Sequence, residues 1–291
     1  MVISREKIEK LYPFESKYLE IRNYKYHYID EGNGETIIML HGNPTWSFLF
    51  RNLVLGLRNQ YRVIVPDHLG CGFSDKPQDY NYRLELHIDN LEDLVMHLRL
   101  KKVTLIMHDW GAAIGMGFAT RYPERIKRLI ITNSAAFSMP RHIPLRIALC
   151  RIPRLGEALV RKWNLFSKAA VHMAVTKPLP PDVMEAYIMP YDSFANRIAI
   201  YSFVKDIPMS FRDSSYELIK NIESGIWMFR ELPVLLIWGM KDWCFTPPFL
   251  KKWIDFLPNA KVVRLDNASH WLFEDEPRKI LEEIREFLDK R

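Results

Sequence analysis

Three segments rich in groups that can react or bind follow short apolar runs in this 291-residue sequence. They are HGN at 41–43, DH at 67–68 and HDW at 108–110. Runs rich in Val, Ile and Leu predict buried strands of a parallel sheet, and reactive groups gather at the carboxyl ends of such strands. These segments are therefore the first candidates for an active site.

Asp109 stands at a predicted strand-to-helix turn. The residues that follow it are small, with Gly111, Gly115 and Gly117 among them, so the helix and the strand can pack closely. This is the setting of the nucleophile elbow G-x-S-x-G, with Asp in place of Ser. A helix N-terminus favours an anionic carboxylate there. The alternative is that Asp109 serves only as an N-cap.

Two later strand ends supply an acid and an imidazole. Asp242 follows the apolar run 234–238, and His270 follows the run 261–265. Nucleophile, acid and histidine then occur in the chain order of the α/β-hydrolase triad. We interpret Asp109, Asp242 and His270 as catalytic.

The elements that must position these residues are predicted by hydrophobic periodicity. The pattern favours an α/β protein with about eight strands in a mostly parallel sheet and helices on both faces. An antiparallel hairpin is expected around Asn23. The other expected strands are 36–40, 62–66, 103–107, 129–132, 234–238 and 261–265, and the main expected helices are 84–98, 111–122, 247–256 and 277–289.

About a hundred residues between the strands ending at Thr132 and beginning at Val234 lack a strand signal and contain many prolines. They are too long for a loop within a compact sheet. We predict a helical cap domain at 138–230, inserted into a catalytic domain formed by 1–137 and 231–291. Plain core packing is the first interpretation of five large side chains that are also candidates for an apolar pocket lining: Phe137, Phe166, Phe194, Phe203 and Trp243.

Four segments resemble the haloalkane dehalogenases of the α/β-hydrolase superfamily: HGNPTWSFLFRN at 41–52, PDHLGCGFSDKP at 66–77, HDWGAAIGMGFA at 108–119 and SHWLFEDEP at 269–277. The resemblance implies an α/β-hydrolase fold whose cap follows the sixth strand. It also implies that Asp109 is the nucleophile and His270 the base, and that the Asn43 amide and the Trp110 indole bind the leaving group.

The position of the acid separates branches of that family. One branch has a Glu after the strand that follows the nucleophile helix, but here NSAAF at 133–137 has no carboxylate, which leaves Asp242. This arrangement resembles the class III dehalogenases. That class also resembles the β-lactone decarboxylases of bacterial long-chain olefin synthesis, and YDSFANRIAIYSFVKDIP at 191–208 is similar to theirs.

An Asp nucleophile that attacks an sp3 carbon forms an ester, and water can then attack the carboxyl carbon of Asp109. His270 would act as general base for that water, oriented by Asp242. The backbone N–H groups of Asn43 and Trp110 would form an oxyanion hole, worth ~3 kcal/mol per donor.

Haloalkane dehalogenase is the first functional hypothesis, and β-lactone decarboxylase, which makes cis-alkenes, is the alternative. A catalytically silent hydrolase fold that only binds a ligand is a further possibility. An epoxide hydrolase is less favoured because ring opening needs an acid donor, usually a cap tyrosine; the candidates are Tyr187, Tyr191, Tyr201 and Tyr216.

Composition narrows the class of protein. Apolar residues make up 48% of the chain, and no apolar run approaches the ~20 residues of a membrane helix. The N-terminal residues lack a signal-peptide pattern and the three cysteines are far apart, so we expect a cytoplasmic protein with reduced thiols. No metal site is predicted from His41 or His68, and no cofactor is expected because GCGFS is not a nucleotide-binding motif.

The net charge of +6 has an uneven distribution. Residues 138–230 contain thirteen Lys or Arg and eight Asp or Glu. A small apolar substrate is the expected partner, and a nucleic acid is not. The basic, apolar segment 141–162 could contact a lipid surface or a partner enzyme, or could simply be a solvated helix face.

Overall fold

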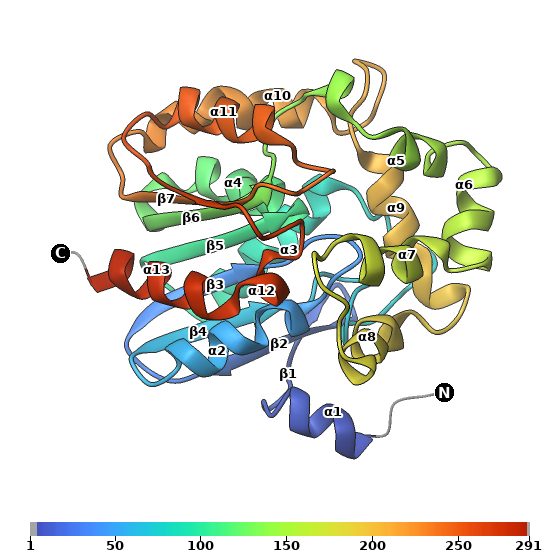
Figure 1. Cartoon of the computed structure of the whole chain (residues 1–291), viewed down its shortest axis with the longest axis horizontal. Helices are drawn as coiled ribbons and strands as arrows, with labels where there is room; N and C mark the ends of the chain where they lie inside the picture. The colour runs from blue at the N-terminus through green and yellow to red at the C-terminus, as the bar shows by residue number, and fades with distance from the viewer. Residues whose placement is uncertain (1–4, 290–291) are drawn as a thin grey trace.

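The computed structural model describes residues 5–289, in which eight strands form one sheet flanked by helices (Figure 1). Their order is β1-β2-β4-β3-β5-β6-β7-β8, with β1, β2 and β4 paired antiparallel and the other neighbours parallel. The predicted mostly parallel sheet and its hairpin are therefore confirmed. The strands are β1 (Lys17–Ile21), β2 (Tyr24–Glu31), β3 (Glu35–Leu40), β4 (Tyr61–Pro66), β5 (Val103–Asp109), β6 (Ile126–Ser134), β7 (Val234–Gly239) and β8 (Lys261–Leu265).

The helices of the described range fall into two groups. Those packed on the sheet or on the helices that cover it are α2 (Arg51–Leu57), α3 (Leu84–His97), α4 (Trp110–Arg121), α10 (Tyr216–Gly225), α11 (Pro247–Phe256), α12 (Leu272–Asp275) and α13 (Pro277–Asp289). The others are α1 (Arg5–Leu11), α5 (Leu145–Cys150), α6 (Leu155–Glu157), α7 (Leu165–Met173), α8 (Pro181–Ile188) and α9 (Ile198–Asp206).

Alternate side chains of the central strands enter two separate cores. In β3, Ile37 and Met39 pack with residues of α2 and α13, whereas Ile38 and Leu40 pack with residues of α3 and α4. Burying such an aliphatic side chain contributes ~1.5–3 kcal/mol. Because a one-residue shift would exchange the two faces, this alternation fixes the register of the strands and hence the position of their ends.

The described stretch between β6 and β7 contains helices joined by loops and no strand, as expected for an insertion after the sixth strand. In Figure 1, α5 to α9 lie together on one side of the molecule, beyond the sheet. The division into a catalytic and a cap domain at residues 138 and 230 stays a prediction. Within the described chain, no helix combines the length and apolar character that crossing a bilayer requires.

Candidate active site

The site lies where the chain changes direction across the sheet. From β3 the chain passes to β4 on one side, and it later returns to β5 on the other side of β3. Residues that leave the carboxyl ends of β3 and β5 therefore meet at a topological switch point, where ligands bind in open α/β sheets. Gly42 and Asn43 come from the first end and Asp109 from the second.

Asp109 adopts φ 51° and ψ −126°. A non-glycine residue in such a conformation costs of order 1–3 kcal/mol, so the surrounding structure must hold it there. Its side chain makes no N-capping hydrogen bond. Instead, the backbone N–H of Asn43 donates to Asp109 Oδ1 at 2.6 Å. A Cβ at Gly42 would overlap the Asp109 carboxylate, so glycine permits this close approach.

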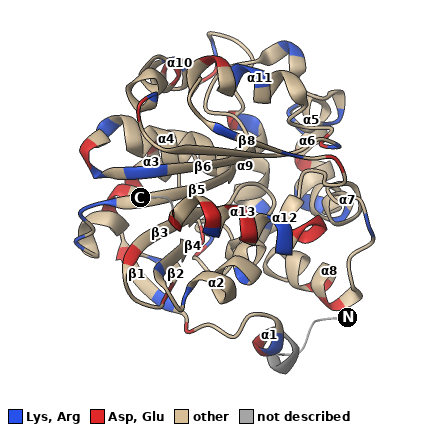
Figure 2. Cartoon of the chain, turned by 60° about the vertical axis from the view of Figure 1, so that its left-hand side comes forward, with Lys and Arg blue, Asp and Glu red and all other residues tan. Residues whose placement is uncertain are grey.

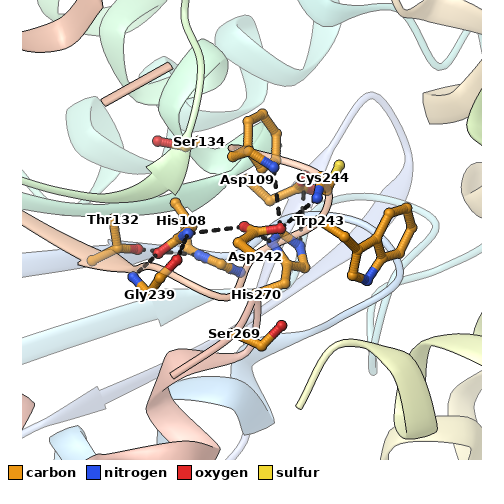
Figure 3. Close-up of polar contacts among 12 residues, drawn as sticks. His108, Asp109, Thr132, Ser134, Gly239, Asp242, Trp243, Cys244, Ser269 and His270 are labelled. Carbon is orange, nitrogen blue, oxygen red and sulfur yellow. Dashed lines mark hydrogen bonds and ion pairs between the residues drawn. The ribbon is translucent and has the colours of Figure 1, made fainter. Parts of the chain in front are cut away.

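His270 lies between the two acids (Figure 3). Its Nδ1 is 2.9 Å from Asp242 Oδ2, and its Nε2 is 4.0 Å from Asp109 Oδ2. A proton on Nδ1 satisfies the Asp242 carboxylate and leaves the Nε2 lone pair facing Asp109. The three residues that sequence reasoning selected are thus brought together.

The pKa values of the pair shift for different reasons. Burial raises the pKa of Asp109, although His270 and the backbone N–H groups of Asn43 and Trp110 oppose this shift. Burial alone would lower the pKa of His270, but the Asp242 carboxylate, with a further contribution from Asp109, outweighs burial and the pKa of His270 is raised. Both groups therefore hold their protons to higher pH than usual.

Asp242 is held by amides on both of its oxygens. Its Oδ1 accepts from the backbone N–H groups of Cys244 and Phe245, at 2.6 and 3.1 Å. Its Oδ2 accepts from Asn133 Nδ2 at 2.9 Å, and Asn133 Oδ1 in turn accepts from the Gly239 N–H at 2.7 Å. Sequence reasoning missed Asn133, although its place in β6, beside the end of β7, was a signal.

The predicted leaving-group donors both line the cavity beside Asp109. Asn43 Nδ2 donates one hydrogen to the backbone oxygen of Ile200 in α9 at 3.1 Å, which leaves its second hydrogen for a ligand. The indole of Trp110 packs against Phe203 with ring centroids 5.3 Å apart. Helix α9 thus holds both side chains in place, through Ile200 and Phe203.

The cavity has a volume of about 310 Å³ and a largely apolar lining. Of the five apolar candidates, Phe137, Phe166 and Trp243 line it. Phe194 is half exposed instead, and Phe203 is buried against Trp110. The lining also includes Ile143, Ile147, Leu159, Leu165, Ala169, Ala170, Met173, Val204, Ile207 and Ile219.

The four cap tyrosines are absent from the lining of this cavity. Tyr187 donates to Glu274 at 2.5 Å, and Tyr191 donates to the backbone oxygen of Thr45 at 3.0 Å. These two hydroxyl groups therefore form hydrogen bonds between the segment that joins β6 to β7 and residues outside it. The epoxide hydrolase hypothesis therefore lacks its acid donor.

The histidines that follow or end the other strands, His41, His68 and His108, form hydrogen bonds with residues beside them. The Nδ1 of His41 bonds the Gly42 oxygen at 2.8 Å, and the backbone N–H of His68 donates to His41 Nε2 at 3.0 Å. The Nδ1 of His108 is 3.1 Å from Thr132 Oγ1. The ring of His108 also lies 4.7 Å from that of His270, so it packs beside the site while its polar contact is with Thr132.

Comparisons with known proteins agree with this geometry. The sequence pattern of the alpha/beta hydrolase fold family matches residues 35–149 and 179–277. Among curated proteins, a cis-3-alkyl-4-alkyloxetan-2-one decarboxylase of Shewanella oneidensis is 44% identical over 287 residues, covering 97% of this chain and 90% of that protein. Haloalkane dehalogenase 2 of Mycobacterium tuberculosis is 31% identical over 281 residues, covering 95% and 96%.

A solved structure matches nearly the whole fold. The haloalkane dehalogenase DatA of Agrobacterium tumefaciens superposes with a TM-score of 0.86 at 25% identity, covering 94% of this chain and 96% of that one. The similarity therefore extends through the sheet and through the helices between β6 and β7.

Proposed function

This chain belongs to the alpha/beta hydrolase family, and from that premise we propose that it is a β-lactone decarboxylase with Asp109 as nucleophile. The observation that carries the proposal is the placement of Asp109, with one oxygen held by the Asn43 N–H and the other facing His270. The sequence alone put haloalkane dehalogenase first. The relative at 44% identity, whose name specifies an oxetan-2-one, favours the alternative over the dehalogenase at 31%.

The first step opens the four-membered ring. Asp109 Oδ2 attacks the sp3 ring carbon that is bonded to the ring oxygen, and the bond between that sp3 carbon and the ring oxygen breaks. The ring carbonyl becomes a carboxylate, for which the Asn43 amide and the Trp110 indole supply neutral N–H donors. Such donors stabilise the new anion without the strong pairing of a Lys or Arg.

The second step releases both products. The bond from the substrate carboxylate to its neighbouring carbon breaks, and its electrons form the double bond. The ester bond to Asp109 breaks at the same time, which yields carbon dioxide, an alkene and the free Asp109 carboxylate. No water is consumed. Inversion in the first step followed by anti elimination in the second converts a cis-lactone to a cis-alkene.

Haloalkane dehalogenation is the second candidate, favoured by the dehalogenase relative and by the presence of a complete triad. Displacement of a halide forms the same kind of ester on Asp109. Water then attacks the Asp109 carboxyl carbon, with His270 as general base and Asp242 orienting the imidazole. The N–H groups of Asn43 and Trp110 stabilise the oxyanion.

One paired assay distinguishes the two functions. The purified protein is incubated with a dialkyl cis-β-lactone and, separately, with 1-bromobutane, and alkene and bromide are measured. We expect rapid alkene formation and little bromide. Bromide release without alkene would reject the decarboxylase proposal, and full turnover by Asp109→Asn would reject Asp109 as nucleophile.

A further inference from the structure

We propose that the outer face of segment 141–163 binds the surface of an anionic lipid bilayer and places the cavity mouth against it. We call this surface the basic apolar face. It is formed by the exposed side chains of residues 141–163, a segment that includes α5, α6 and the π-helical turn η4 (Ala158–Lys162). The proposal does not rest on the proposed reaction, because binding to vesicles is measured without turnover.

The apolar part of the face is unusual for a surface. Five of the thirteen large apolar side chains that are exposed in the described residues lie in this segment: Leu145, Leu149, Ile152, Leu155 and Trp163. Leu145 is 74% exposed, and Leu149, Ile152 and Leu155 are each at least 40% exposed. A cluster of exposed apolar side chains on a folded protein marks a binding surface more often than chance exposure does.

The charge of the face points to an anionic occupant. Segment 141–163 contains six Lys or Arg and one acid, Glu157, so it carries +5 of the chain's net charge of +6. Glu157 is paired with Arg161. Within the described structure, Arg141, Arg154 and Lys162 are exposed and form no ion pair. Figure 2 marks basic positions in blue along this part of the ribbon, beside α5 and α6.

Residues that line the cavity are also exposed next to this face. Arg146 in α5, and Leu165 and Ala169 in α7, line the cavity and are also exposed. Asp109 lines the same cavity. An apolar compound dissolved in a bilayer could therefore pass from the lipid to the nucleophile without crossing water.

A bilayer fits these features better than a protein partner does. Basic residues interleaved with apolar side chains suit an interface where the apolar groups enter the acyl boundary and the cations meet anionic headgroups. Leu145, Leu149, Ile152 and Leu155 supply the first kind of contact. Arg141, Arg154 and Lys162 supply the second.

The test uses the full chain and vesicles of phosphatidylcholine with or without about 30 mol% phosphatidylglycerol, an anionic lipid. Binding is measured by co-sedimentation at low and high salt. The test variant is Arg141→Glu/Arg154→Glu/Lys162→Glu, in which no altered residue lines the cavity. The control Lys101→Glu/Lys102→Glu/Arg230→Glu reverses three exposed charges that precede β5 and β7, and both variants have the same net charge.

We expect the wild-type chain to bind anionic vesicles, and high salt to weaken this binding. The test variant should bind at least about tenfold more weakly, and the control within about twofold of wild type. Leu145→Gln/Leu149→Gln/Leu155→Gln should also weaken binding while retaining the salt effect. Unchanged melting temperatures and unchanged bromobutane or lactone turnover in detergent show that the variants are folded.

Three results would overturn the proposal. The first is no binding of the wild-type chain to anionic vesicles, and the second is an equal loss of binding in the test and control variants. The third is concentration-dependent self-association, measured by analytical ultracentrifugation, that the test variant alone abolishes. This result would assign the face to a second copy of the chain.

Discussion

The two carboxylate oxygens of Asp109 have different surroundings, and this difference assigns them different roles in the proposed reaction. Oδ1 is bound by the Asn43 N–H, whereas Oδ2 faces His270 across 4.0 Å. In the proposed reaction Oδ2 is therefore the attacking oxygen, and Oδ1 becomes the carbonyl oxygen of the ester. In hydrolysis this same oxygen takes the developing charge, already beside its donor.

Replacing His270 should separate the two reactions. In His270→Phe, dehalogenation is expected to stop after about one equivalent of bromide, because no base activates water, and its steady-state rate should fall by at least ~10²-fold, the lower end of a general base's contribution. Alkene formation should persist at a rate within about tenfold of wild type, because elimination consumes no water. Bromide and alkene time courses measure both. Equal loss of the two activities would contradict the water-free route.

The pH dependence should separate them as well. Hydrolysis needs neutral His270, so bromide turnover should fall as the pH drops through the raised pKa of His270. Alkene formation needs ionised Asp109, so it should fall only as the pH drops through the raised pKa of Asp109. As the pH drops, bromide turnover should therefore be lost before alkene formation, and the ratio of alkene to bromide should increase. Identical acid limbs in the two rate profiles would show that both reactions need neutral His270.

Sequence order at strand ends was enough to select Asp109, Asp242 and His270. It could not select Asn133, whose role depends on β6 and β7 being neighbours and on the rotamer that directs its amide to Asp242. The contact between Asn43 and Ile200 was equally hidden, since it joins residues 157 positions apart. Side-chain partners of this kind arise from packing between distant segments.

At the scale of elements, strands and long helices were predictable because their periodicity is strong. Helices α11 and α13 have the bounds expected from the sequence, and α3 ends one residue earlier. Helices α5 to α9 have at most nine residues each. Helices this short are marginal in water, so their bounds are set by tertiary contacts that local sequence does not reveal.

A buried ionic cluster joins three helices, α2, α8 and α12. Arg51 in α2 forms a bidentate pair with Glu274 in α12, and Tyr187 in α8 donates to the same carboxylate. Burial alone would lower the pKa of Arg51, but Glu274, with a further contribution from Tyr187, outweighs burial and the pKa of Arg51 is raised, so the guanidinium stays charged. The Tyr187 ring also stacks on Trp271, next to His270 in the chain, at 4.3 Å.

Glu274→Gln should therefore destabilise the protein strongly, because it leaves the Arg51 charge buried without a counter-ion. We expect a loss of ~3–5 kcal/mol in the free energy of unfolding, measured by urea denaturation. The matched control is Asp255→Asn, which breaks the exposed pair with Lys251 and should have little effect. Equal effects of the two substitutions would contradict the structural role of this cluster.

At the scale of the whole molecule, the sheet supplies the reacting groups and the inserted helices supply the pocket. Asp109 and His270 line one end of the cavity, and α5 and α7 line another part. The sheet-derived residues were predictable. Which cap side chains face inward was not, because this depends on how several short helices pack together.

Filling the cap side of the cavity should change substrate preference. Ala170 in α7 lines the cavity and is half-buried. Ala170→Phe should lower kcat/KM for a long-chain lactone by ~10–200-fold, the effect of losing space for one or more methylene groups, and should leave 1-bromobutane turnover almost unchanged. The control Ala148→Phe alters α5 outside the lining. Equal losses for both substrates would show that α7 does not border the alkyl chains.

The central claim is that Asp109 forms an ester that decomposes without water when the substrate is a β-lactone. The most direct test is turnover in H₂¹⁸O, followed by mass spectrometry of the peptide that contains Asp109. After many turnovers of a cis-β-lactone, alkene should accumulate and Asp109 should stay unlabelled, whereas 1-bromobutane should introduce ¹⁸O into Asp109. Labelling of Asp109 during lactone turnover, together with a β-hydroxy acid in place of alkene, would contradict the claim.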